Sequence, residues 1–122
     1  MIKKHLVILT LILTAQFLYA SPFSENGRLR VDGLQLVNQC GTPVQLRGVS
    51  THGIGWFDGC YTQASVQYAA NTMNADIFRI AMYVKASESG YLQNPAYWTS
   101  RVNQMVDWIG AAGMYALITG TY

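Results

Sequence analysis

Apolar and polar residues alternate between residues 28 and 37, around an Asp32-Gly33 pair, and this pattern predicts a β-hairpin. The Cys-Gly-Thr-Pro segment at residues 40–43 predicts a second turn. The apolar residues within 44–49 predict a strand that ends in the polar and glycine residues 50–53. This part of the chain is therefore predicted to form a hairpin followed by one strand, with glycines 53, 55 and 59 marking the next loop.

Two helices are predicted farther along the chain. The first covers residues 62–73, with Thr62 as its N-cap. Its apolar residues recur at the spacing of one helical face: Val66, Ala69, Ala70 and Met73. The second helix starts at Asn94-Pro95 and ends before Gly113. Its stripe consists of Trp98, Val102, Met105, Ile109 and Ala112.

Two more strands alternate with these helices. Residues 76–83 are almost continuously apolar, as expected for a parallel strand buried on both faces, and residues 114–118 predict another strand. A polar loop is predicted at residues 85–93. Strands alternating with helices indicate an α/β fold with a parallel sheet. Three strands and two helices leave large faces of such a sheet uncovered, so the pattern indicates the opening part of a larger domain.

Residues 1–20 have the pattern of a secretory signal peptide. Lys3 and Lys4 precede an apolar run at residues 6–19, and the small residue Ala20 suits the position before a cleavage site. A membrane anchor is the alternative, but this run is shorter than the roughly 20 residues that span a bilayer. We therefore expect a secreted, extracellular protein that starts at Ser21 after cleavage.

Residues 21–122 have no net charge, because they contain six basic and six acidic residues. The chain's net charge of +2 comes from Lys3 and Lys4. Without a basic patch, nucleic acids and anionic membranes are poor partners, and a neutral substrate is favoured.

Two cysteines, Cys40 and Cys60, lie within the part expected to be exported. An oxidising compartment favours a disulfide between them, and free, partly buried thiols are the alternative. Their spacing fits no zinc-site pattern, and His52 alone cannot supply the remaining ligands.

Three motifs in order resemble one family. The segment LQLVNQCGTPVQLRGVS at residues 34–50, followed by THGIGWF and DIFRIAMY, resembles the N-terminal third of family 5 glycoside hydrolases, and most of all their bacterial endoglucanases. The resemblance implies a TIM (β/α)8 barrel, of which residues 21–122 hold only an N-terminal β-hairpin and roughly the first three strands and two helices. It also implies retaining hydrolysis of internal β-1,4-glucosidic bonds in cellulose-type polysaccharides by a monomer that needs no cofactor or metal.

The resemblance implies substrate-binding roles for four residues. His52, next to the end of the first barrel strand, matches a histidine that hydrogen-bonds sugar hydroxyls, with a turn histidine as the alternative. Trp56 and Phe57 match an aromatic pair that packs against sugar rings, and Tyr83 at the end of the second strand matches a substrate-contacting tyrosine. Local loop and rim packing are the alternatives for these three. Active sites of such barrels lie at the C-terminal ends of the strands, which is where the predicted strands place these residues.

Arg79 interrupts an otherwise apolar strand, where an unpaired charge would be costly. The resemblance implies a site-supporting role, in which the guanidinium keeps the nucleophilic carboxylate ionised and oriented. A structural ion pair with another acid inside the barrel is the alternative.

The catalytic pair is expected elsewhere. A retaining glycosidase needs two carboxylates about 5 Å apart, and in this family both are glutamates after the fourth and seventh strands. This chain contains only Glu25 and Glu88, which we interpret as solvated surface charges. After Ile118, Thr-Gly-Thr-Tyr also replaces the Asp-Trp-His usual in the family. The chain alone is therefore expected to be inactive. The alternatives are a truncated non-catalytic product or a family member that acts on mannan or another β-glucan.

Overall fold

The computed structural model describes residues 20–121. The predicted signal peptide, residues 1–20, lies outside this range except for its last residue. Within residues 20–121, no helix combines the length and the apolar character needed to cross a membrane.

The described chain opens with a short helix and a hairpin. Helix α2, Pro22–Asn26, starts at the N-cap Ser21, whose hydroxyl accepts the N–H of Ser24 at 3.2 Å. Strands β1, Arg30–Asp32, and β2, Gln35–Val37, then pair antiparallel. The intervening Gly33 has a φ of 60°, which a glycine adopts readily. This confirms the predicted hairpin.

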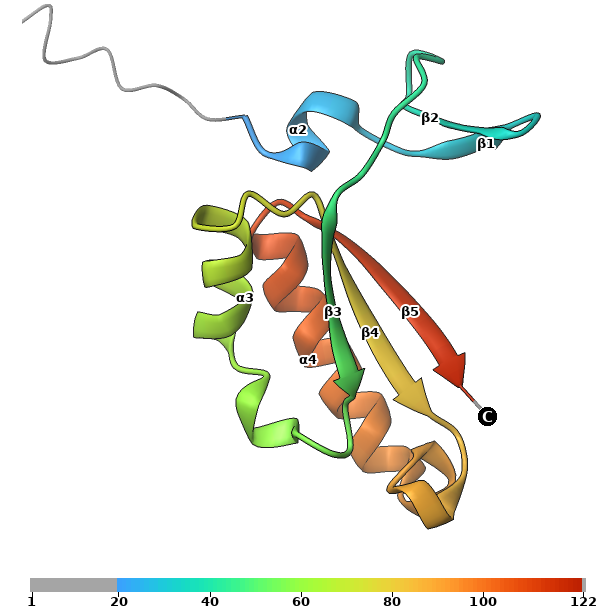
Figure 1. Ribbon diagram of the computed structural model, residues 1–122, viewed down its shortest axis with the longest axis vertical. Coiled ribbons are helices and arrows are strands. Elements are labelled where there is room, and N and C mark those ends of the chain that lie inside the picture. Colours follow the sequence, from blue (N-terminus) through green and yellow to red (C-terminus); the bar gives the residue numbers. More distant parts are fainter. Residues whose placement is uncertain (1–19, 122) are drawn as a thin grey trace, which may run out of the picture.

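A three-stranded parallel sheet forms the centre of the described chain. It consists of β3, Gly48–Gly53, β4, Ile77–Tyr83, and β5, Tyr115–Thr121, in the order β3-β4-β5. Figure 1 shows α2 and the hairpin at the end where these strands begin. The opposite end of the sheet carries the loops that follow β3 and β4. These contain three 3-10 turns: η1, Asp58–Cys60; η2, Ala86–Glu88; and η3, Tyr91–Gln93.

The first sheet strand lies four residues later than predicted. Residues 44–47 are not part of a strand, and β3 instead continues through residues 50–53. Pairing with β4 sets these bounds, because Gly48 is opposite Ile77 and Gly53 is opposite Ala81, with a bulge between. His52 therefore belongs to the end of the strand rather than to the residues after it.

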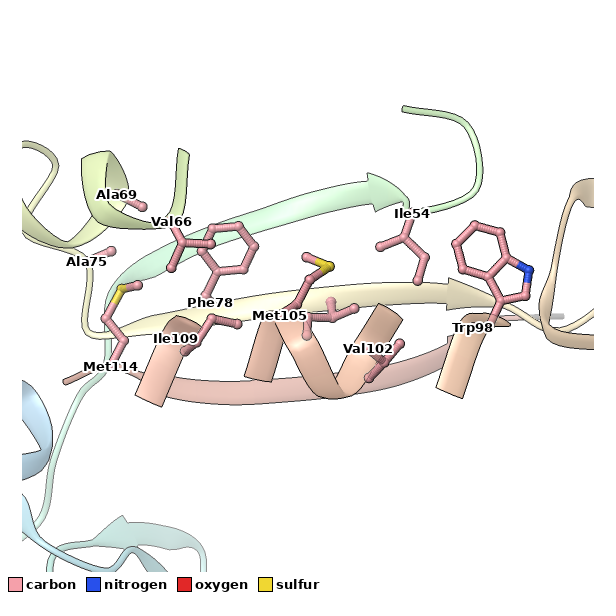
Figure 2. Packing of buried hydrophobic residues seen from close by; sticks show 11 residues of the cluster. Ile54, Val66, Ala69, Ala75, Phe78, Trp98, Val102, Met105, Ile109 and Met114 are labelled. Atoms are coloured by element: carbon pink, nitrogen blue, oxygen red, sulfur yellow. The ribbon is translucent and has the colours of Figure 1, made fainter. Parts of the chain in front are cut away.

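Two helices pack on one face of the sheet (Figure 1). Helix α3, Gln63–Asn71, has a capping box in which Thr62 and Ser65 bond each other's backbone N–H. Helix α4, Pro95–Ala111, starts at Asn94, whose side chain accepts the N–H of Tyr97. Figure 2 shows their apolar side chains meeting those of the strands. The most deeply buried are Ile54, Val66, Ile80, Met105 and Ile109.

The stripe of α4 is confirmed, but that of α3 is shorter than predicted. Trp98, Val102, Met105 and Ile109 are all buried, as are Val66 and Ala69. The prediction that Met73 belongs to this stripe is wrong, because α3 ends at Asn71 and the Met73 side chain is 55% exposed. Helix geometry no longer holds at residue 73, so the seven-residue spacing from Val66 does not place it on the core face.

The other face of the sheet has no covering helix among the described residues. Side chains alternate along a strand, and since Phe78 and Ile80 pack in the core, Arg79 faces the opposite side. The register places Ser50 and Leu117 beside Arg79 on this face, where Leu117 is 44% exposed. Of the β4 side chains on this face, Ala81 is buried whereas Ile77, Arg79 and Tyr83 are half-buried, so the prediction that this strand is buried on both faces holds only in part. In a closed β/α barrel the uncovered face would point inward.

The last strand extends past its predicted end. Thr119, Gly120 and Thr121 continue β5 and pair with the last three residues of β4. Three of the residues that depart from the family pattern, Thr119 to Thr121, are thus part of a regular strand.

The expected disulfide is absent from the structure. Cys40 and Cys60 are free and exposed. Cys40 follows the hairpin before β3, whereas Cys60 lies in η1 after it, and a six-residue strand spans roughly 20 Å. Within the described residues the two thiols are therefore not paired.

Candidate functional site

Four rings gather at the C-terminal ends of β3 and β4. The His52 ring lies 5.2 Å from Trp56 and 5.8 Å from Phe57, measured between ring centroids. Trp56 in turn stacks on Tyr83, with centroids 6.0 Å apart and planes inclined by 21°. We call His52, Trp56, Phe57 and Tyr83 the aromatic group. It contains all four residues that the sequence predicted to bind substrate, drawn from two strands and one loop.

The backbone of Gly53 makes room for the aromatic group. A Cβ atom built on Gly53 would collide with the ring of Tyr83. Tyr83 therefore lies directly on the end of β3, which brings its ring beside Trp56. A second glycine, Gly55, holds the loop close to the backbone of Ser89 in the same way. Gly53 and Gly55, two of the three glycines predicted to mark this loop, thus allow close packing that a larger residue would prevent.

A hollow of about 470 Å³ adjoins the aromatic group. Its walls are the loop after β3 and the turn η2, and its lining residues are Gly55, Trp56, Phe57, Ser87, Glu88 and Ser89. Trp56 and Phe57 are about half exposed, so their rings are accessible to a ligand. Glu88, interpreted from the sequence as a solvated charge, is half-buried beside these rings. No motif marked this carboxylate, because its neighbours come from a loop about 30 residues earlier in the chain.

Arg79 lies on the uncovered face of the sheet, four residues before Tyr83 on β4. Its guanidinium donates a hydrogen bond to the hydroxyl oxygen of Ser50 at 2.9 Å. Within residues 20–121 no carboxylate pairs with Arg79, and the two ion pairs found there involve Arg30 and Arg101. The structural ion pair considered from the sequence is thus not formed within this part of the chain. The guanidinium is half-buried and has donors left for a further acceptor.

The backbone of His52 is held by a tyrosine that the sequence analysis missed. The N–H of His52 donates to the hydroxyl oxygen of Tyr61 at 3.1 Å. Burial raises the pKa of this hydroxyl above its ordinary value, and the hydrogen bond from His52 opposes part of that rise. Tyr61 follows η1, so the same loop that carries Trp56 and Phe57 also holds the end of β3.

A polar cluster behind this loop was also missed. Arg101 of α4 forms an ion pair with Asp58 at 2.5 Å and stacks over the ring of Trp108 at 5.4 Å. The hydroxyl of Tyr97 donates to the other oxygen of the same carboxylate, and this bond raises the pKa of Tyr97. Asp58 and Arg101 are 43 residues apart, and nothing in their local sequence patterns indicates a contact.

Comparison with known proteins identifies the family to which this arrangement belongs. The model of the family described as cellulase (glycosyl hydrolase family 5) matches residues 37–119. The chain belongs to glycoside hydrolase family 5. The matched segment includes the whole aromatic group and Arg79, and it confirms the resemblance found in the sequence.

Two individual relatives support the same assignment. The chain is 50% identical over 98 residues to endoglucanase CelA of Streptomyces lividans and 44% identical over 98 residues to endoglucanase E-5 of Thermobifida fusca. Each match covers 80% of this chain. The chain spans only 21% of the length of each of these relatives.

A solved structure shows how this segment fits a family 5 domain. The catalytic domain of the Thermobifida fusca endoglucanase Cel5A, solved in complex with cellotetraose, matches with a TM-score of 0.78 and 43% identity. The match covers 82% of this chain and 32% of that domain. The predicted fold class, a TIM barrel of which this chain supplies an N-terminal part, is thereby confirmed.

The two glutamates lie apart from each other in this family 5 segment. Glu25 is exposed on α2, at the end of the sheet where the strands begin. Glu88 lies at the other end, where active sites of such barrels are found. A pair of carboxylates about 5 Å apart, as a retaining glycosidase requires, is therefore not formed by these two residues.

Proposed function

We propose that the complete protein containing this chain is an endo-β-1,4-glucanase and that the aromatic group forms part of its sugar-binding cleft. The observation that carries this proposal is the gathering of His52, Trp56, Phe57 and Tyr83 at the C-terminal ends of adjacent parallel strands. The names of the two relatives above, both endoglucanases, favour the same substrate class.

The chemistry of the aromatic group suits a β-glucan. A glucose ring presents C–H groups on its faces, which pack against aromatic rings, and hydroxyls at its edge, which need polar partners. Trp56 and Tyr83 offer nearly parallel ring planes, and His52 contributes ring nitrogens within the same group. Stacking surfaces beside a hydrogen-bonding side chain are what an uncharged sugar requires.

Hydrolysis in this proposal follows the retaining route. One glutamate attacks the anomeric carbon while the second protonates the departing glycosidic oxygen, which leaves a glycosyl-enzyme ester. The second glutamate then takes a proton from water, which attacks the anomeric carbon and releases the first carboxylate. Both glutamates would come from barrel strands beyond the segment described. In this proposal Arg79, whose guanidinium has donors left beyond its bond to Ser50, donates to the nucleophilic carboxylate and favours its ionised form.

Export is part of the proposal. Residues 1–20 serve as a signal peptide that is removed after Ala20, so that the enzyme acts outside the cell on a polymer too large to enter it. The enzyme is proposed to act as a monomer, without cofactor or metal.

The proposal is tested with the purified complete protein and a panel of polysaccharides. Reducing ends are measured after incubation with carboxymethylcellulose, barley β-glucan, galactomannan and xyloglucan, and proton NMR records the first anomer released from cellotetraose. We expect activity on the two glucans first named and initial release of the β-anomer. Preference for galactomannan would favour the mannanase alternative, no activity on any polymer would favour a non-catalytic product, and an initial α-anomer would exclude retention.

A further inference from the structure

Arg101 donates hydrogen bonds to the loop that carries Trp56 and Phe57. These bonds reach both ends of η1. Its Nε donates to the Asp58 carboxylate at 2.5 Å. Its Nη2 donates to two backbone carbonyl oxygens, those of Asp58 at 3.0 Å and Tyr61 at 2.6 Å. The planar guanidinium therefore fixes the first residue of η1 and the residue that follows it from a single rigid helix.

The Arg101 side chain is itself held in place. Its third nitrogen, Nη1, donates to the side chain of Gln104 at 2.8 Å, and the guanidinium lies over the ring of Trp108. Only 12% of the Arg101 side chain is exposed, and 27% of the Asp58 side chain. Partial burial and five contacts make this pair unlike an exposed ion pair, which fluctuates and contributes little.

Two sets of bonds connect the residues held by Arg101 to the aromatic group. Phe57 is bonded covalently to Asp58, and its carbonyl oxygen accepts the N–H of Cys60 within η1. Tyr61, whose carbonyl is held by Arg101, uses its hydroxyl to hold the N–H of His52. The rings of His52 and Trp56 contact each other, so the residue held by Tyr61 also packs against the loop that precedes Asp58.

We propose that Arg101 is a positioning residue for substrate binding, acting through Asp58 and Tyr61 to keep His52, Trp56 and Phe57 in one arrangement. This inference rests on the proposed function, because it assigns Arg101 to the same sugar-binding cleft. Arg101 itself touches neither the aromatic group nor the open cleft. Its contribution is to reduce the number of arrangements that the loop can adopt before sugar binds, which lowers the entropic cost of binding.

Two conservative variants of the complete protein test this role. Arg101→Lys keeps the charge but cannot reach the Asp58 carboxylate and both carbonyls at once, and Tyr61→Phe removes only the hydroxyl that holds His52. Each has a matched control. Arg30→Lys alters an exposed pair with Asp32 on the hairpin, and Tyr68→Phe alters an exposed tyrosine of α3 whose hydroxyl makes no hydrogen bond within residues 20–121.

The first readout needs no substrate. Hydrogen–deuterium exchange with mass spectrometry is followed in peptides covering residues 50–62, at a temperature where all variants are folded. We expect faster exchange there in Arg101→Lys and Tyr61→Phe, and unchanged exchange in both controls. Unchanged exchange in Arg101→Lys and Tyr61→Phe would overturn the proposal, whether or not the protein proves to be a glucanase.

The second readout separates positioning from stability. With cellotetraose as substrate, we expect KM to rise about two- to tenfold in Arg101→Lys and Tyr61→Phe, as the loss of one or two hydrogen bonds implies, with kcat nearly unchanged. A lower melting temperature with KM unchanged would mean that the cluster only stabilises the fold and would overturn the proposal. If the unmodified protein does not cleave β-glucans, the proposed function fails, and the exchange data alone decide the role of Arg101.

Discussion

The ring of Tyr83 lies on the backbone of Gly53, in the space that a Cβ atom would occupy. This contact joins the ends of β3 and β4 and places Tyr83 parallel to Trp56. One added carbon atom at residue 53 would therefore disturb the proposed sugar-binding surface.

Replacement of Gly53 by alanine is expected to weaken substrate binding. The added methyl group displaces the Tyr83 ring and breaks its stacking on Trp56, which should raise KM for cellotetraose about two- to tenfold, in line with the roughly 0.5–1.5 kcal/mol typical of an aromatic pair. Gly59→Ala in the same loop is the control, because a Cβ atom there meets nothing within 4 Å. Equal KM values for the two variants would mean that Tyr83 does not help to bind substrate.

Arg79→Gln is expected to impair the chemical step. Loss of a charge-assisted hydrogen bond to the nucleophile should lower kcat about 10- to 100-fold. Removing the nearby positive charge also raises the pKa of that carboxylate, so the acidic limb of the kcat/KM profile should move to higher pH. Ser50→Ala, which removes the partner of Arg79 but keeps the charge, should leave that limb in place. A normal kcat and pH profile in Arg79→Gln would assign the arginine to packing alone.

Tyr115 should make the stability of the fold sensitive to alkaline pH. Burial raises the pKa of its hydroxyl above the ordinary value of 10.0, and this hydroxyl donates to the carbonyl oxygen of Gly27 at 2.5 Å. A raised pKa in the folded state means that its stabilisation is complete below the unfolded pKa and is lost as pH rises through the folded value. Tyr115→Phe should therefore be less stable than the parent by about 1 kcal/mol at pH 7, and this gap should narrow above roughly pH 10. Melting temperatures of both proteins from pH 7 to 11 measure the gap, and a gap that does not change with pH would contradict the assignment.

Residues 21–122 expressed alone should self-associate. Leu117 and Ile118 point to opposite faces of β5, yet their side chains are 44% and 48% exposed, and β5 is an edge strand of the described sheet. Exposed apolar side chains on an unpaired edge favour association between chains. Sedimentation velocity should show oligomers or aggregates, reduced by Leu117→Lys. A monomer with one cooperative thermal transition would show that this segment is a stable unit by itself.

Local sequence signals predicted the elements well and their limits less well. The caps at Thr62 and Asn94 and the stripe of α4 were found because they depend on residues within a few positions of each other. The bounds of β3 were missed because they depend on Ile77 and Ala81, which lie about 30 residues later in the chain. Strand limits set by a distant partner cannot be inferred from the strand itself.

In the candidate site, too, some features were predicted from the sequence, whereas contacts between residues distant in the chain were not. Membership of the aromatic group was predicted from the family resemblance, and the predicted strand ends agreed with it because ends of parallel strands meet at one edge. The contact of Arg101 with Asp58 was not predicted, since an arginine on a helix and an aspartate in a loop usually remain solvated. The disulfide between Cys40 and Cys60 was expected from the compartment, but both thiols are free in the structure.

Internal cleavage of cellulose-type chains by the complete protein is tested most directly by viscometry of carboxymethylcellulose. Specific viscosity and reducing ends are recorded together on the same sample. An endoglucanase should remove most of the viscosity while few reducing ends have formed, because each internal cut shortens a chain greatly. Reducing ends that accumulate while viscosity persists, or no change in either quantity, would contradict the claim.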